Sequence, residues 1–257
     1  MTPELIALTR PVSASIAECE LTHLSRAPID VVRAAAQHSA YEAALRLLRV
    51  SVIQVGAAPE LPDAVFIEDT AIVLDEVAVI TRPGADIRRR ETDAVAEVLS
   101  EYRTVLALDA PATLDGGDVL TMGRTIYVGR SGRTNDEAIA RVGAMLGPYG
   151  YRVVAVDFAG CLHLKSAVTA VAYDVVLLNP AWVRASAFPG YEIIHVDPSE
   201  PHAANGLRVA GAVVFPEHFP LTRTRLEGRG LHVVTVPCDE LAKAEGAVTC
   251  CCLLFSV

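Results

Sequence analysis

The sequence predicts an α/β protein assembled from structural repeats of the size found in propeller-like arrays. Three patterns indicate this class: short β-branched apolar runs, helical segments between them, and tight strand–turn–strand pairs. The turns fall near Asp75, Gly123, Tyr173 and Gly211, so they are roughly 40–50 residues apart. Simple alternation of one strand with one helix would instead indicate a doubly wound parallel sheet.

The expected strands are apolar runs bounded by turn residues. They are Val50–Val55, Ala71–Leu74, Val77–Thr81, Val105–Leu108, Asp118–Met122, Thr125–Val128, Arg152–Val156, Val175–Leu178, Glu192–Val196, Ala212–Phe215, His232–Val236 and Val248–Phe255.

Helices are expected where apolar residues recur at helical spacing. These segments are Asp30–Leu48, Glu91–Tyr102 and Asn135–Leu146, and Leu221–Glu227 has a weaker pattern. The third follows Thr134 and opens on Asn135, a residue type that commonly caps a helix N-terminus.

Composition narrows the class of protein. Of 257 residues, 52% are hydrophobic and 21% charged, which excludes a disordered chain. The net charge is 22 − 31 = −9, which argues against a nucleic-acid or anionic-membrane partner and is compatible with a small cationic one. The length suits a sizeable core, and we expect one catalytic domain over residues 1–257, as a monomer or a homodimer.

A membrane span is not expected. The best apolar stretch, Ala167–Leu178, is interrupted by Asp174 and ends at Asn179-Pro180, short of the ~20 residues that a span needs. The N-terminus lacks the pattern of a signal peptide. The expected location is therefore the cytoplasm.

Three of the six cysteines are consecutive, which is a poor disulfide framework, and no spacing matches a structural zinc site. One interpretation is that they fill a buried last strand, with Cys250 and Cys252 on one face and Cys251 on the other. The other is that one of them is a nucleophile that works with a histidine and a carboxylate elsewhere.

Two acidic clusters follow or precede apolar runs, at Asp63–Asp69 and at Asp115–Asp118. Such acids either cap turns or face a functional cavity. His163, between Leu162 and Leu164, is either a core residue or a general acid–base with a tunable pKa.

The arginines at Arg88–Arg90 and Arg133 suit either a solvated surface or the capture of a substrate carboxylate. A further clue is position along the chain. Intervals of 46, 48, 42 and 45 residues separate Asp69, Asp115, His163, Asn205 and Cys250. If these positions are equivalent in successive repeats, the polar groups surround one axis.

Seven segments in order resemble the dimethylarginine dimethylaminohydrolases of the pentein, or guanidino-group-modifying, superfamily. They are LPDAVFIEDTAIV, ITRPGADIRRRET, ATLDGGDVL, GRSGRTN, LHLKS, AAN and GAVTCC, and the resemblance runs from about residue 5 to the C-terminus. It implies a five-bladed α/β propeller of ββαβ-type units with the site at its centre. It also implies hydrolysis of Nω-methylated arginine to citrulline and a methylamine, without a metal or organic cofactor.

The resemblance also assigns roles by position. It makes Cys250 the nucleophile, His163 the acid–base and Asp115 the carboxylate that orients it. The implied substrate-binding residues are Glu68 and Asp69 for the guanidinium, Asp63 for the α-ammonium, Phe66 between Asp63 and Glu68, Arg88 and Arg133 for the α-carboxylate, and Leu21 and Ala244 for backbone contacts at the amino end.

Two departures from the family pattern bear on the pocket. Arg88 is the first of three arginines, so its assignment rests on its spacing from Gly84, and Ala244 is smaller than the usual branched residue. The alternatives are hydrolysis of plain arginine or of another Nω-modified arginine or citrulline-like compound. An alternative of another class is a non-catalytic guanidine-binding or thiol-based zinc- or redox-sensing protein.

Overall fold

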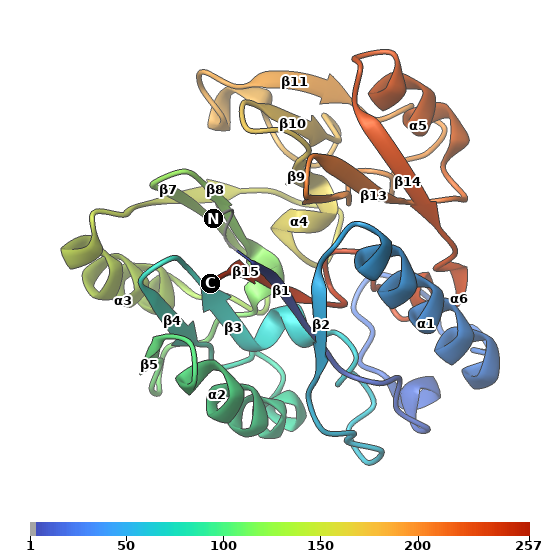
Figure 1. Cartoon of the computed structure of the whole chain (residues 1–257). Coiled ribbons are helices and arrows are strands. Elements are labelled where there is room, and N and C mark those ends of the chain that lie inside the picture. Colours follow the sequence, from blue (N-terminus) through green and yellow to red (C-terminus); the bar gives the residue numbers. More distant parts are fainter. Residues whose placement is uncertain (1–3) are drawn as a thin grey trace.

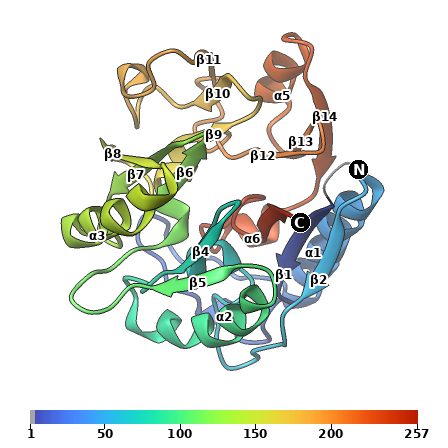
Figure 2. The ribbon, with the colours of Figure 1, turned by 60° about the vertical axis from the view of Figure 1, so that its left-hand side comes forward.

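The computed structural model describes residues 4–257. Over that range it contains five small sheets of three strands each, arranged in a ring that follows the chain (Figures 1 and 2). In every sheet the middle strand pairs antiparallel with the first strand and parallel with the third. The fold is therefore the five-bladed α/β propeller that the sequence predicts.

The bounds of the strands follow the ring. The sheets are β3 (Ala71–Val73), β4 (Val77–Ile80) and β5 (Thr104–Ala107); β6 (Val119–Met122), β7 (Thr125–Arg130) and β8 (Arg152–Asp157); β9 (Val168–Ala170), β10 (Val175–Leu178) and β11 (Glu192–His195); β12 (Leu207–Val209), β13 (Ala212–Pro216) and β14 (His232–Val236); and β15 (Leu253–Ser256), β1 (Leu5–Thr9) and β2 (Ser51–Gln54).

The fifth sheet joins the two ends of the chain. Its first strand, β15, pairs antiparallel with β1, with Leu5 opposite Ser256 and Leu8 opposite Leu253. The N- and C-terminal segments therefore lie side by side near the centre of Figure 1. This pairing closes the ring.

Four sheets use an α-helix to pass from the middle strand to the third: α1 (Val31–Leu47), α2 (Thr92–Ser100), α3 (Asp136–Leu146) and α5 (Pro220–Glu227). Asp30 caps α1 by accepting from Arg33 N, and Asn135 caps α3 by accepting from Ala138 N. Such caps each stabilise a helix by about 1 kcal/mol. The third sheet has only the short 3₁₀ turn η6 (Ala185–Ala187) at this place.

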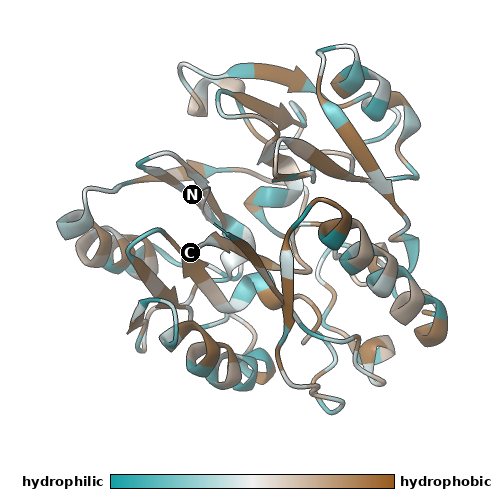
Figure 3. Ribbon diagram, in the orientation of Figure 1, coloured by the Kyte–Doolittle hydropathy of each residue, from teal (hydrophilic) through white to brown (hydrophobic). Residues whose placement is uncertain are grey.

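The hydrophobic core lies inside each blade and in the space between neighbouring sheets. All four residues of β4 and all five of β13 are buried, and the strands are the most apolar parts of the ribbon (Figure 3). Buried middle strands need apolar side chains on both faces, which explains their continuous Val, Ile and Ala composition. Within the described residues, no helix is both long enough and apolar enough to cross a membrane.

The predicted strand Val248–Phe255 is wrong in its first half. Residues 248–252 form a turn, and the strand begins only at Leu253. Two bonds to distant residues explain this: Asn205 Oδ1 accepts from Thr249 N, and Cys250 O accepts from Glu68 N. The expected alternation of Cys250, Cys251 and Cys252 across a strand therefore does not apply.

Several elements are too short for a periodic pattern. The strands β9 and β12 have three residues each, and the helices α4 (Leu164–Ala167) and α6 (Asp239–Ala242) have four. The prediction also omits β1, whose partners are distant in sequence. It correctly places the four hairpin turns and the four longer helices to within a few residues.

Candidate active site

The chemically versatile side chains lie just before the first strand of each sheet. These first strands contact one another, β15 with β3, β6 with β9 and β9 with β12, so they form the inner ring. The residues that precede them are therefore delivered to the axis. They are Glu68 and Asp69 on the 3₁₀ turn η2 (Ile67–Thr70), Asp115 before η4 (Gly116–Asp118), His163 and Lys165 at α4, Asn205 before β12, and Cys250 before β15.

A small cavity of about 20 Å³ lies among these turns. Nine of the eleven predicted site residues line it: Asp63, Phe66, Asp69, Arg88, Asp115, Arg133, His163, Ala244 and Cys250. A space of this size holds about one water molecule, so an amino-acid ligand requires the walls to separate.

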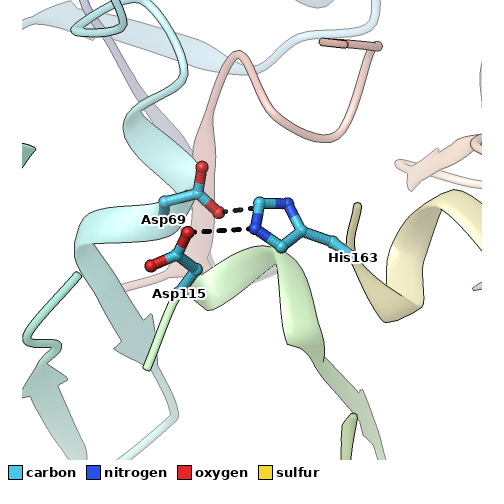
Figure 4. A group of neighbouring side chains, drawn as sticks. All are labelled: Asp69, Asp115 and His163. Atoms are coloured by element: carbon cyan, nitrogen blue, oxygen red, sulfur yellow. Dashed lines mark hydrogen bonds and ion pairs between the residues drawn. The ribbon is translucent and has the colours of Figure 1, made fainter. Parts of the chain in front are cut away.

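The acid–base cluster consists of Asp69, Asp115 and His163. The carboxylates of Asp69 and Asp115 both point towards the imidazole of His163 (Figure 4). Asp115 Oδ2 lies 3.0 Å from His163 Nε2, and Asp69 Oδ1 lies 3.8 Å from His163 Nδ1. Burial of the ring opposes protonation, but the charge of Asp69 and the bond to Asp115 outweigh it and raise the pKa of His163 to about 9. The ring is therefore an imidazolium at neutral pH.

Backbone groups fix the cluster. Asp115 accepts from Gly84 N at 2.8 Å, and Asp69 accepts from Gly117 N at 2.8 Å. Gly117 is also required sterically, because a Cβ there would lie 2.5 Å from His163 Nδ1. Asp118, buried in the same turn, accepts from Leu164 N and so holds the residue after the histidine.

Arg88 is buried, unlike the solvated surface considered for the arginine run. Its Nη1 lies 2.5 Å from Asp69 Oδ2, and its Nη2 and Nε bind Glu91. Burial would raise the pKa of Asp69, but His163 and Arg88 outweigh burial and lower it to about 2. Arg89 is half-buried and Arg90 exposed, and Arg88 alone of the three lines the cavity.

The nucleophile cluster consists of Glu68, Lys165, Thr249 and Cys250. One Glu68 carboxylate oxygen pairs with Lys165 Nζ, and the other accepts from Thr249 Oγ1 at 2.8 Å. Glu68 N donates to Cys250 O at 3.1 Å. The guanidinium-binding acid expected at Glu68 therefore contacts the peptide segment that carries the cysteine.

Cys250 is half-buried, whereas the other five cysteines are buried. Burial, together with the charges of Glu68 and Asp69, raises the pKa of the Cys250 thiol. The neutral thiol is thus the stable form in the unliganded site. A bound cation would oppose both carboxylates and favour the thiolate.

A loop over residues 20–25 closes one side of the cavity. The Glu245 carboxylate accepts from three consecutive backbone N–H groups at residues 22–24, at 3.1, 2.6 and 2.5 Å. Arg133 Nη2 donates to Thr22 Oγ1 at 3.2 Å. Glu245 itself has a positive φ of 59°.

Two predicted residues do not line the cavity. Glu68 faces Lys165 and Thr249, and Leu21 lies in the loop over residues 20–25. Asp63 lines the cavity, but its Oδ2 accepts from Glu20 N at 3.1 Å, so it holds the loop. Sequence reasoning missed Lys165 and Thr249, although each lies within two residues of a predicted catalytic residue.

One group among the described residues could ligate a metal ion. It is the acid–base cluster, whose ligand atoms lie within 4.8 Å of one another. Its polar atoms already bind one another, two backbone amides and Arg88.

Comparison with known proteins gives consistent matches. A family model described as N,N dimethylarginine dimethylhydrolase, eukaryotic, matches residues 20–186. The N(G),N(G)-dimethylarginine dimethylaminohydrolase of Streptomyces coelicolor is 40% identical over 96% of this chain and 96% of that protein. The protein of the same name from Pseudomonas aeruginosa is 32% identical over 99% of this chain and 100% of that protein.

Solved structures agree. The Pseudomonas aeruginosa enzyme, as a cysteine-to-serine mutant complexed with citrulline, matches with a TM-score of 0.94 and 30% identity over 99% of this chain and 100% of that one. The N-terminal domain of ArgZ, a cyanobacterial arginine dihydrolase, matches with a TM-score of 0.88 at 20% identity over 98% of this chain and 97% of that one, so it shares the fold.

Proposed function

Because the chain belongs to the dimethylarginine dimethylaminohydrolase family, we propose that it hydrolyses Nω-methylated L-arginine to L-citrulline and a methylamine. The substrate is asymmetric dimethylarginine or monomethylarginine, and the enzyme is a cysteine-dependent hydrolase with one catalytic domain. The observation that carries the proposal is one cavity lined together by Cys250, His163, Asp115 and Asp69.

Binding uses the charge pattern of the cavity. Asp69, which lines the cavity, binds the cationic guanidinium, Glu68 adds its negative charge from its position beside Lys165 and Thr249, and Asp63 receives the α-ammonium. Arg88 and Arg133, which line the same cavity, serve the α-carboxylate. Phe66 lies against Gly246 and forms an apolar wall, and backbone groups of Leu21 and Ala244 complete the amino-acid end.

The first half of the reaction forms a covalent intermediate. The bound cation lowers the pKa of the Cys250 thiol, which releases its proton to solvent, and the resulting thiolate attacks the guanidinium carbon. His163, as an imidazolium, gives its proton to the methylated nitrogen, and the carbon–nitrogen bond breaks. The methylamine departs and leaves an amidino group on Cys250.

The second half consumes water. His163, now neutral, takes a proton from a water molecule as its oxygen attacks the amidino carbon. The carbon–sulfur bond then breaks, and the hydroxyl proton of the adduct is transferred to the departing thiolate, which releases citrulline and the cysteine thiol. Asp115 holds the imidazole and stabilises its charged form in both halves.

The test compares citrulline formation from asymmetric dimethylarginine, monomethylarginine and arginine, with mass spectrometry of protein quenched during turnover. We expect faster turnover of the methylated substrates and an amidino adduct on Cys250. Cys250→Ala should lose activity by about 10⁴-fold or more, whereas Cys251→Ser should keep it.

Each contrary outcome has a clear meaning. Faster turnover of arginine would overturn the substrate assignment, and citrulline formation by Cys250→Ala would remove the nucleophile assignment. A protein that binds these compounds but forms no citrulline from any of them would be a binding or sensing protein.

A further inference from the structure

Asn205 is a buried side chain to which the reaction above assigns no role. It lies two residues before the start of β12, at the fourth of the five turns around the axis, and the residue is 3% exposed. The other four turns supply Glu68 and Asp69, Asp115, His163 and Cys250. The fourth turn thus contributes an uncharged amide to a ring of ionisable groups.

The amide makes three hydrogen bonds. Its Nδ2 donates to Thr249 Oγ1 at 2.9 Å and to Lys165 O at 3.2 Å, and its Oδ1 accepts from Thr249 N at 3.0 Å. The orientation of the amide is fixed by these partners, because Thr249 N can only donate and Lys165 O can only accept.

These bonds direct the proton of Thr249. The hydroxyl oxygen accepts from Asn205, so its single proton is free to point at Glu68, whose Oε2 lies 2.8 Å away. The same amide holds Thr249 N, and the next residue along the chain is Cys250. Cys250 O in turn accepts from Glu68 N.

We propose that Asn205 is a positioning residue that aligns the Cys250 segment with the Glu68 carboxylate through Thr249. It touches neither substrate nor the reacting atoms. Its bonds also join Lys165, which pairs with Glu68, so one amide connects the third, fourth and fifth turns to the first. This inference rests on the proposed function.

Removing the Asn205 amide leaves Glu68, Thr249 and Cys250 present but misaligned. With Asn205→Ala, the Thr249 hydroxyl loses a donor and the Thr249 backbone N–H loses its acceptor, so the hydroxyl can rotate away from Glu68. With the isosteric Asn205→Asp, the hydroxyl can donate to the introduced carboxylate in place of Glu68. Small misplacements of reacting groups cost about 10²-fold in rate.

The first test measures kcat and KM for dimethylarginine. We expect Asn205→Ala and Asn205→Asp to lower kcat about 10–100-fold and to change KM less than about threefold. Iodoacetamide should also alkylate Cys250 of Asn205→Asp more slowly at fixed pH, because the added negative charge raises the pKa of the thiol.

The matched control is Asn179→Ala. Asn179 is also 3% exposed, and its side chain binds Ala181 N and Pro201 O away from the cavity. We expect a comparable fall in Tm but kcat within about twofold of the parent enzyme. A merely structural role for Asn205 would give the same result at both positions.

A double-mutant cycle tests the linkage through Thr249. Thr249→Val keeps the side-chain shape and removes the hydroxyl, whereas Thr249→Ser keeps the hydroxyl and should restore kcat to within about threefold of the parent. We expect Asn205→Ala combined with Thr249→Val to be no slower than the slower single variant. Thr249→Val tests the same path if Asn205→Ala does not fold.

The inference is overturned if folded Asn205 variants keep the parent kcat, or if the two losses multiply. It is also overturned if Thr249→Val keeps the parent kcat. These outcomes are separate from failure of the proposed function, which would appear as no citrulline formation by the parent protein or as citrulline formation by Cys250→Ala.

Discussion

The acid–base cluster and Cys250 of the nucleophile cluster line one cavity, but the two clusters hold their protons for different reasons. In the first, two carboxylates face an imidazole and raise its pKa to about 9. In the second, burial and two carboxylates raise the pKa of a thiol, and Lys165 only partly opposes them. Asp69 acts on both groups.

The comparison shows that both the His163 imidazole and the Cys250 thiol are protonated in the unliganded site. An imidazolium is the form that can protonate a leaving amine, so the acid–base cluster is ready before substrate binds. The thiol is in its unreactive form and needs a cation beside Glu68 and Asp69 to ionise. Substrate binding therefore activates the nucleophile cluster, whereas the acid–base cluster is already in its active form.

Among changes that keep Cys250, removing the imidazole should have the largest effect. We expect His163→Gln to lower kcat about 10³-fold, because the basic methylamine would have to leave without a proton donor. The measurement is citrulline formation, with the exposed His195→Gln as a control that keeps the parent rate. A loss of less than tenfold would mean that another group supplies the proton.

Neutralising Glu68 should make the Cys250 thiol more reactive in the unliganded protein but lower the rate of turnover. Glu68→Gln removes a charge that raises the pKa of Cys250, so iodoacetamide should alkylate the unliganded protein faster. Turnover should fall about 10–100-fold, because the guanidinium loses a carboxylate.

The control for this pair of measurements is Glu76→Gln, which removes a carboxylate that pairs with Arg124 far from the cavity. Alkylation and turnover that change in the same direction in Glu68→Gln would contradict the substrate-dependent ionisation of the thiol.

Asp115→Asn should remove one negative charge from the acid–base cluster while keeping the shape of the side chain. The pKa of His163 should fall towards its ordinary value, which NMR titration of the ring would show, and kcat should fall about tenfold. An unchanged His163 pKa would assign the shift to Asp69 and Asp118.

The same variant should change the pH dependence of stability. The His163 pKa is about 9 when folded and about 6.5 when unfolded, so its contribution is full below pH ~6.5 and is lost as the pH rises towards 9. Urea unfolding at pH 6 and pH 9 should show a loss on the order of 2 kcal/mol for this group in the parent protein, and a smaller loss in Asp115→Asn.

Loosening the loop over residues 20–25 should have the smallest effect on both clusters. Glu245→Ala removes the acceptor of three backbone N–H groups, so proteolysis within the loop should become faster and KM should rise by about two- to fivefold. Glu227→Ala, which breaks an exposed pair on α5, is the control. Unchanged proteolysis would show that other contacts hold the loop.

Much of this architecture is readable from the chain, because hairpin turns and helix caps are local. The regular spacing of Asp69, Asp115, His163, Asn205 and Cys250 also corresponds to their delivery to one axis. The direction of Glu68 is not local: it follows Lys165 and Thr249, which lie 97 and 181 residues away in sequence. The turn at residues 248–252 depends on similarly distant partners, so an apolar run there is misread as a strand.

The pairing of β15 with β1 links the positioning of Cys250 to the order of folding. These strands come from opposite ends of the described chain, so their contact has the greatest loop-closure cost of any sheet pairing here. Four blades can assemble while the segment that carries Cys250 is still unanchored. Citrulline formation would then appear only in the last step of refolding, and partly assembled molecules would be inactive. Citrulline formation at earlier refolding times would contradict this order.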